Sequence, residues 1–189
     1  MNEPVRKLTF TFTEYLVQER AGDTKHELIN GEIYDMTGGT GEHARLASNM
    51  TGVLLGQLHG KPCAVFSSDL LVRVLATGMA TYPDLSVICG RFEPDPEDKN
   101  VATNPVILVE VLSDGTESKD RGEKFAHYRR IPSLMEYILV SQHEPRIEVF
   151  RRTEQGWILS EATAGESVKM LSIDGELSVD AVYANALER

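Results

Sequence analysis

The chain has 189 residues, of which 41% are apolar and 25% charged, and its 19 basic and 29 acidic side chains give a formal net charge of −10. This composition excludes a disordered or fibrous chain and is sufficient for one hydrophobic core. The acidic excess opposes non-specific attraction to DNA or to an anionic membrane. We expect a single domain over 1–189 in a soluble, cytoplasmic protein, because no apolar run reaches the length of a signal peptide or membrane span.

The N-terminal third predicts a helix, a β-hairpin and a longer helix. Thr-Phe-Thr-Glu at 11–14 is a capping box that opens a short helix through about Arg20. Residues 25–36 place Asn-Gly between two β-prone runs, and this dipeptide is typical of a two-residue hairpin turn. After a glycine-rich stretch, apolar residues recur every three or four positions, which predicts a helix over 42–59.

Several β-forming runs come next. Short runs at 64–66 and 70–74 precede one at 83–88, and another at 104–112 follows the loop 91–104, which is rich in proline and acidic residues and is expected to be solvated. The runs at 83–88 and 104–112 have the composition of strands that are buried on both faces.

The second half predicts another helix and a second hairpin. A polar turn leads into a helix of about 120–130. Strands at 137–140 and 147–150 are expected to pair, the segment 157–159 can extend their sheet, and a weak helix is expected over 179–187. This order of elements predicts a mixed α/β or α+β fold built on one central sheet.

Two carboxylates stand out because they lie in strands that should reject them. Asp84 opens one strand behind a proline, and Glu110 lies between two valines in the other. Burying an ionised carboxylate costs on the order of several kcal/mol unless a cation or a hydrogen-bond donor compensates it. A shared Mg²⁺ or Mn²⁺ is the simplest compensation, because both ions prefer carboxylate oxygens.

The two cysteines belong to no recognisable motif. Cys63 and Cys89 form no CxxC pair, and neither has a histidine at zinc-finger spacing. We expect both to be reduced thiols packed in the core.

Six segments occur together in one order: residues 27–32, His43 after a glycine-rich turn, residues 82–88, residues 109–113, residues 120–124 with Tyr128, and residues 136–140. Together they resemble the Uma2 family, which is assigned to the restriction-endonuclease-like PD-(D/E)XK superfamily. The resemblance covers a core from about residue 10 to 152 and leaves a C-terminal β/α extension over 153–189. It implies a restriction-endonuclease-like fold with added β-hairpins.

The resemblance also implies a metal-dependent endonuclease that hydrolyses phosphodiester bonds of nucleic acid, with DNA as the expected substrate. Asp84 and Glu110 would hold Mg²⁺ or Mn²⁺ with the backbone carbonyl of Val111. The metal would act as a Lewis acid and lower the pKa of bound water.

The lysine of the superfamily motif is absent from the strand, where Leu112 stands in its place. The matching family position is Lys124, in the following helix, which we expect to orient or deprotonate the attacking water; Lys119 is its competitor. Glu27, as an extra metal or water ligand, and His43, as a phosphate contact or proton carrier, are secondary site residues.

Each of these residues has a structural alternative. Asp84 could cap the entrance of its strand, and Glu110 could form an ion pair with Arg73 or Lys124. Lys124 or Glu27 could instead face solvent, His43 could be structural, and Tyr128 could serve packing alone.

Other functions stay open. The fold could persist as a degenerate binding or scaffolding module, or the protein could hydrolyse a small phosphorylated substrate in a closed pocket. Basic residues in 119–130, with three later arginines, could form a locally positive face. Without a set of stacking aromatics or a helix-turn-helix, sequence-specific base readout is not expected. A homodimer formed through edge strands in 137–160 is a further hypothesis, and no membrane contact is expected.

Overall fold

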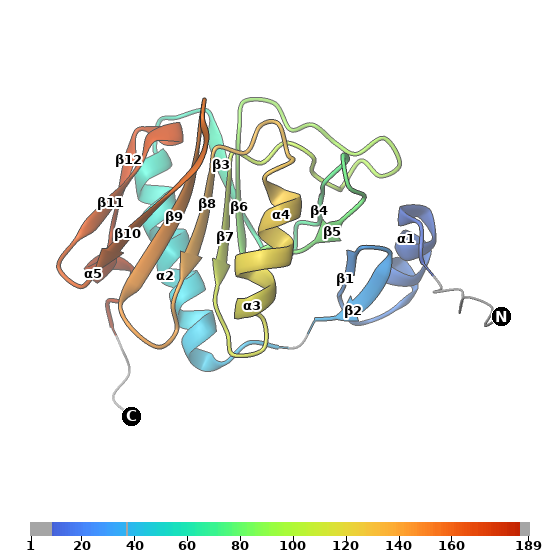
Figure 1. Ribbon diagram of the computed structural model, residues 1–189, viewed down its shortest axis with the longest axis horizontal. Helices are drawn as coiled ribbons and strands as arrows, with labels where there is room; N and C mark the ends of the chain where they lie inside the picture. The colour runs from blue at the N-terminus through green and yellow to red at the C-terminus, as the bar shows by residue number, and fades with distance from the viewer. Residues whose placement is uncertain (1–8, 37, 186–189) are drawn as a thin grey trace.

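A six-stranded mixed sheet forms the centre of the computed structural model, which describes residues 9–36 and 38–185 (Figure 1). The strand order is β10-β9-β8-β7-β6-β3, and β7 pairs with β8 in parallel while the other neighbours are antiparallel. The mixed α/β class predicted from the sequence is confirmed. The strands are β3 (Cys63–Ser67), β6 (Leu85–Cys89), β7 (Ile107–Val111), β8 (Glu136–Val140), β9 (Arg146–Thr153) and β10 (Gly156–Thr163).

Helices cover both faces of this sheet (Figure 1). The predicted helix over 42–59 is α2 (Gly41–Leu58), whose buried residues pack with Val87 and Val109 of the sheet. Each fully buried leucine contributes about 1.5–3 kcal/mol. A second helical segment packs on the opposite face through Tyr128 and makes the crossover that the parallel pair requires. It consists of α3 (Glu117–Lys119), the π-helical turn η1 (Asp120–Lys124) and α4 (Phe125–Tyr128).

A smaller sheet and α1 (Phe12–Ala21) form one end of the molecule (Figure 1). Both sequence signals here are confirmed: Thr11 and Glu14 make the capping box, and Asn30 and Gly31 adopt φ values of 52° and 79° in the hairpin turn. The strand order is β2-β1-β5-β4. These strands are β1 (His26–Ile29), β2 (Glu32–Asp35), β4 (Val72–Arg73) and β5 (Ala80–Thr81).

The opposite end is built from the C-terminal segment (Figure 1). The predicted extension of the sheet by 157–159 is confirmed, because these residues lie in β10. The helix predicted over 179–187 is shorter, since α5 ends at Val182, and positions 186 and 187 lie outside the described residues. The other elements are β11 (Ser167–Met170), η2 (Leu171–Ile173), β12 (Gly175–Ser178) and α5 (Val179–Val182).

The predicted solvated loop over 91–104 is partly wrong. Asp95 is buried and bound by Arg73 at 3.0 Å, and Val101 and Ala102 are buried against neighbouring segments. No helix among the described residues is long and apolar enough to cross a membrane.

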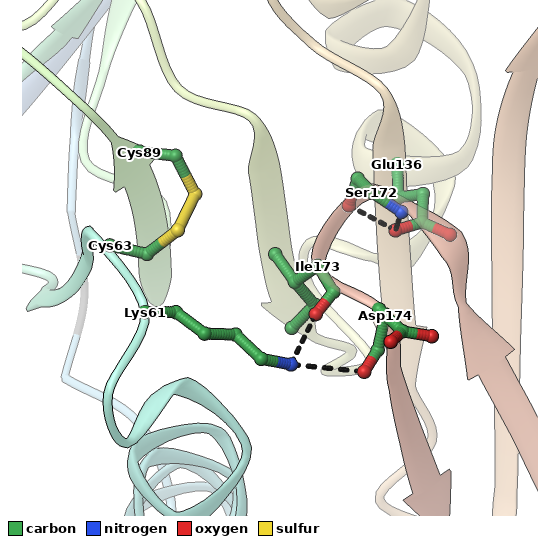
Figure 2. The surroundings of a disulfide bond; sticks show 7 residues. All are labelled: Lys61, Cys63, Cys89, Glu136, Ser172, Ile173 and Asp174. Carbon is green, nitrogen blue, oxygen red and sulfur yellow. Dashed lines mark hydrogen bonds between the residues drawn. A yellow bond between two sulfur atoms is a disulfide. The ribbon is translucent and has the colours of Figure 1, made fainter.

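The expectation of two reduced thiols is wrong. Cys63 and Cys89 face one another in the antiparallel pair β3–β6, with Cα atoms 3.9 Å apart, and they form a disulfide bond. Figure 2 shows the bond near Lys61, whose Nζ donates hydrogen bonds to the carbonyls of Ile173 and Asp174. The strand register, which sequence spacing does not show, determines this pairing.

Candidate functional site

The register between β6 and β7 brings Asp84 and Glu110 together. Leu85 pairs with Val109, so Asp84, one residue earlier, lies opposite Glu110, one residue later. The backbone N–H of Asp84 donates to Glu110 Oε2 at 3.3 Å, and that of Val111 donates to Asp84 Oδ2 at 2.7 Å. The two predicted acids are therefore neighbours at the end of a strand pair.

Lys124 lies among three buried carboxylates. Its Nζ is 2.8 Å from Glu27 Oε1, 3.3 Å from Asp120 Oδ1 and 3.5 Å from Glu110 Oε1. All four side chains are buried. Glu27 Oε1 and Asp120 Oδ1 lie within ion-pair distance of the ammonium but accept no well-aligned hydrogen bond from any described residue.

A buried tyrosine holds Glu110. Tyr128 Oη donates a hydrogen bond to Glu110 Oε1 at 2.9 Å, and Thr81 Oγ1 lies 2.8 Å from the same hydroxyl. Both Thr81 and Tyr128 are fully buried. The hydroxyl therefore restricts the orientation of the Glu110 carboxylate.

His43 reaches the site from the first turn of α2. Thr40 caps this helix by accepting from the backbone N–H of His43, and His43 Nε2 lies 3.1 Å from Asp84 Oδ2. The hydrogen bond with Asp84 raises the pKa of His43, although burial lowers it, and the charges of Asp84 and Asp120 add to the rise. His43 thus contacts Asp84, one of the groups that the sequence assigned to metal binding.

Burial dominates the electrostatics of the acids around Lys124. It raises the pKa of Glu110 well above its usual value, neighbouring carboxylates add to this rise, and Lys124 opposes it. Burial likewise raises the pKa of Asp120. Burial alone would lower the pKa of Lys124, but the surrounding carboxylates hold it well above its usual value, so the ammonium stays protonated.

The helical segment between β7 and β8 delivers three of these residues. Asp120, Lys124 and Tyr128 follow one another at four-residue intervals and so share one face. Arg121 binds Glu148 of β9 at 2.5 Å and Glu117 at 2.7 Å, which fixes the segment against the sheet. The π-helical turn coincides with the site, as π-turns often do.

An open cleft of about 1440 Å³ gives access to this cluster. Its walls also carry two lysine–tyrosine pairs: Lys25 Nζ lies 5.2 Å from the ring centre of Tyr82, and Lys119 Nζ lies 3.7 Å from that of Tyr34. Lys119, the competitor of Lys124, therefore packs on an aromatic ring.

The structure brings Asp84, Glu110, Lys124 and Glu27 together, with His43 at the edge of the group. Sequence analysis missed Asp120, although its position four residues before Lys124 was a readable signal.

The alternative in which Glu110 pairs with Arg73 is wrong, because Arg73 binds Asp95 and Glu97. Tyr128 does more than pack, since its hydroxyl binds Glu110.

The locally positive face stays a prediction, although several of its basic groups are already engaged. Arg121 and Lys124 are bound to acids as described, Arg146 lies within ion-pair distance of Glu144 and Glu161, and Arg151 binds Glu136 at 3.0 Å. Arg152 donates to three backbone carbonyls.

The donor chemistry of the cluster fits a divalent cation. Carboxylates outnumber cations, and two of their buried oxygens lack aligned hydrogen bonds. Among the described residues, however, no group of three or more His, Cys, Asp or Glu side chains is arranged as a metal site. Asp84 and Glu110 are the adjacent pair that could hold a metal from the open cleft.

Comparisons with known proteins agree with this architecture. A model of the Uma2 family, described as "Putative restriction endonuclease", matches residues 12–181. Two uncharacterised proteins of Synechocystis are similar: slr1290, 34% identical with 90% of this chain and 89% of the relative covered, and sll1609, 32% identical with 80% and 86% covered. A crystal structure from Anabaena variabilis, of a "putative nuclease belonging to DUF820", superposes with a TM-score of 0.75 at 18% identity, covering 93% of this chain and 98% of that one.

Proposed function

This chain belongs to the Uma2 family, and on that premise we propose that it is a metal-dependent endonuclease that hydrolyses phosphodiester bonds of nucleic acid, DNA in the first instance. The observation that carries the proposal is the adjacency of Asp84 and Glu110 at the cleft, with Lys124 3.5 Å from Glu110. Two acids at the end of a strand pair, with a lysine from a neighbouring helical segment beside them, are the parts that such a reaction requires.

In this proposal Asp84 and Glu110 hold Mg²⁺ or Mn²⁺, together with the carbonyl of Val111. The bound cation supplies Lewis-acid activation of the phosphoryl group and a lower pKa for coordinated water. Tyr128 holds Oε1 of Glu110, so the second oxygen of this carboxylate is turned toward Asp84. His43 anchors Asp84 from the other side.

Lys124 acts as a charged group in this scheme. Its carboxylate neighbours raise its pKa, which favours the orientation of a water molecule or phosphate oxygen by the ammonium over proton abstraction by a neutral amine. Glu27 and Asp120 position the ammonium through their ion pairs.

The direct test is nicking of supercoiled plasmid DNA. We expect Mn²⁺-dependent nicking that EDTA abolishes and that Glu110→Gln reduces at least about a hundredfold. Asp114→Asn is the matched control, because Asp114 lines the same cleft but is exposed and paired with His143, away from the cluster. Nicking that survives Glu110→Gln would contradict the assignment, and a crystal soaked in Mn²⁺ should show the ion between Asp84 and Glu110.

A catalytically degenerate binding module is the second candidate. The observation that favours it is the ion pairing of Lys124 with its acidic neighbours, which already neutralises part of the cluster. Such a module would cleave no nucleic acid at any Mn²⁺ concentration. A small phosphorylated substrate is less suited to the cleft, whose volume exceeds the usual 300–1,000 Å³ of a ligand pocket.

Two expectations from the sequence stay predictions: the cytoplasmic location and the homodimer. Of the predicted edge strands, β10 lies at the edge of the six-stranded sheet and exposes Ile158 and Leu159, so we infer that a second copy would pair there. A monomeric mass by light scattering at micromolar concentration would exclude this dimer.

A further inference from the structure

We propose that the strand entering the cleft is single-stranded or locally unpaired nucleic acid, whose bases stack on Tyr34 and Tyr82. This inference rests on the proposed function and names the substrate class of the same site. It explains how an acidic cleft can bind a polyanion.

The two tyrosines line the cleft next to residues of the acidic cluster. Tyr34 pairs with Glu27 across the β1–β2 hairpin, and Tyr82 lies two residues before Asp84. Both rings line the cleft and are half-buried. A base stacked on either ring would place its backbone next to the carboxylates.

Each ring is already held in place. The Tyr34 hydroxyl donates to Glu32 at 2.6 Å, and the Tyr82 hydroxyl donates to Glu19 at 2.8 Å. The rings therefore present fixed faces, so that stacking on them requires little ordering of the protein.

Charge alone cannot supply the affinity. Lys25 is paired with Asp69, and Lys124 is surrounded by acids. Among the described residues of the cleft wall, Lys119 is a lysine for which no carboxylate lies in ion-pair distance, whereas Asp35 and Asp114 are acidic and face at most a histidine, and Glu42 is paired with Arg45. A duplex has the higher charge density, so this wall opposes it more strongly than a single strand.

Stacking supplies what charge does not. Aromatic rings bind unpaired bases without regard to sequence, because every base has a π-face. Lys25 and Lys119 already lie over these two rings, so one face of each ring is open to a partner that comes from the cleft. When a base takes that place, the displaced ammonium can reach the adjoining phosphate.

The test measures binding separately from cleavage. Fluorescence anisotropy compares a labelled oligothymidylate of about twelve nucleotides with the same strand annealed to its complement, in Ca²⁺ and with a gel check that the strand stays intact. The variants are Tyr34→Leu/Tyr82→Leu, which removes both rings, and Tyr34→Phe/Tyr82→Phe, which keeps the rings and removes the hydroxyls.

We expect the wild type to bind the single strand more tightly than the duplex, the Leu variant to lose at least about tenfold in affinity, and the Phe variant to lose less than about threefold. Equal or tighter binding of the duplex, or a similar loss in both variants, would overturn the inference. Thermal unfolding shows whether each variant is folded; if the double Leu variant is not, the single Tyr82→Leu and Tyr34→Leu variants take its place.

The two proposals fail in different ways. Tight, ring-dependent binding of the single strand without cleavage in Mn²⁺ would remove the endonuclease and leave this inference intact. Cleavage of duplex plasmid, together with binding that does not depend on the two rings, would support the endonuclease and remove this inference.

Discussion

At Lys124, one ammonium group faces three carboxylates that have lost most of their contact with water. Removing the ammonium leaves the buried carboxylates without a counter-charge, and removing the carboxylates leaves the ammonium without one. An unpaired buried charge costs more free energy than the ion pair contributes to stability. The cluster is therefore both the candidate site and a source of instability. This residue-scale conflict gives two predictions.

Lys124→Met should lower the free energy of unfolding by about 3–5 kcal/mol at pH 7, because Glu110 and its neighbours lose their cation. The pKa of Glu110 in the folded protein is raised above its unfolded value, so its protonation favours folding at low pH, and this stability is lost as the pH rises through the folded pKa. The deficit of the variant should therefore shrink between pH 8 and pH 5. Urea denaturation of both proteins at pH 5 and pH 8 measures the difference in their free energies of unfolding. An equal difference at the two pH values would contradict the prediction.

Tyr128→Phe should lower the rate of Mn²⁺-dependent cleavage and raise the Mn²⁺ concentration that gives the half-maximal rate, because Glu110 loses the hydroxyl that orients it. Removing the buried hydroxyl should also cost about 1–3 kcal/mol of stability. Tyr15→Phe is the matched control: Tyr15 is equally buried and donates to the carbonyl of His26, outside the cluster. If both variants reach their half-maximal rate at the same Mn²⁺ concentration, the Tyr128 hydroxyl does not orient Glu110 for metal binding, and Tyr128 serves packing alone.

The sequence could reveal Asp84 and Glu110 because a carboxylate in a doubly buried strand is visible as an anomaly. Asp120 carried no such anomaly, since an acid in a helix usually faces solvent, and its four-residue spacing to Lys124 was the one signal that pointed to it. The Cys63–Cys89 bond was also hidden, because it depends on the register of β3 against β6. Tyr34 and Tyr82 looked like ordinary strand residues until the fold placed them in one cleft.

At the scale of elements, the β1–β2 hairpin matters because it carries Glu27 and Tyr34 into the cleft. Its turn was predictable from Asn-Gly, whose left-handed backbone the structure confirms. The two-residue strands β4 and β5 were less predictable, because such short pieces have no periodicity and depend on pairing with β1 and with each other. The π-helical turn was not predictable either, because nothing in a four-residue spacing distinguishes it from an α-helix.

Gly31→Ala should destabilise the protein by more than about 1 kcal/mol. A methyl group at this position would meet Thr9 Cβ at 2.9 Å, and φ of 79° strains any residue with a side chain. Gly56→Ala is the control, because Gly56 lies exposed in α2 with open space around it, and the change should stabilise by about 0.5–1 kcal/mol. Urea denaturation compares the two, and destabilisation of the same size in both would contradict the argument.

At the scale of the whole molecule, the disulfide between β3 and β6 fixes one edge of the central sheet. Its reduction should lower the free energy of unfolding by about 3 kcal/mol, because the unfolded chain gains freedom. Guanidinium unfolding with and without dithiothreitol measures this difference. The Cys63→Ala/Cys89→Ala variant should show no response to dithiothreitol, and two titratable thiols in the untreated protein would restore the expectation of reduced cysteines.

The same bond bears on where the protein works. Disulfides persist in oxidising compartments and are rare in the cytosol, so the cytoplasmic location predicted from the sequence and the Cys63–Cys89 bond favour different surroundings. Alkylation of thiols in intact cells, followed by mass analysis, would show which state the living cell maintains.

The cleft draws its side chains from Glu27 near the beginning of the chain, from Asp84 and Glu110 in its middle and from Tyr128 well beyond them. Contacts between such distant positions form only after large loops have closed, which slows folding. A chain still emerging from the ribosome cannot assemble the cluster until Tyr128 has been synthesised. The candidate site therefore stays incomplete throughout most of translation.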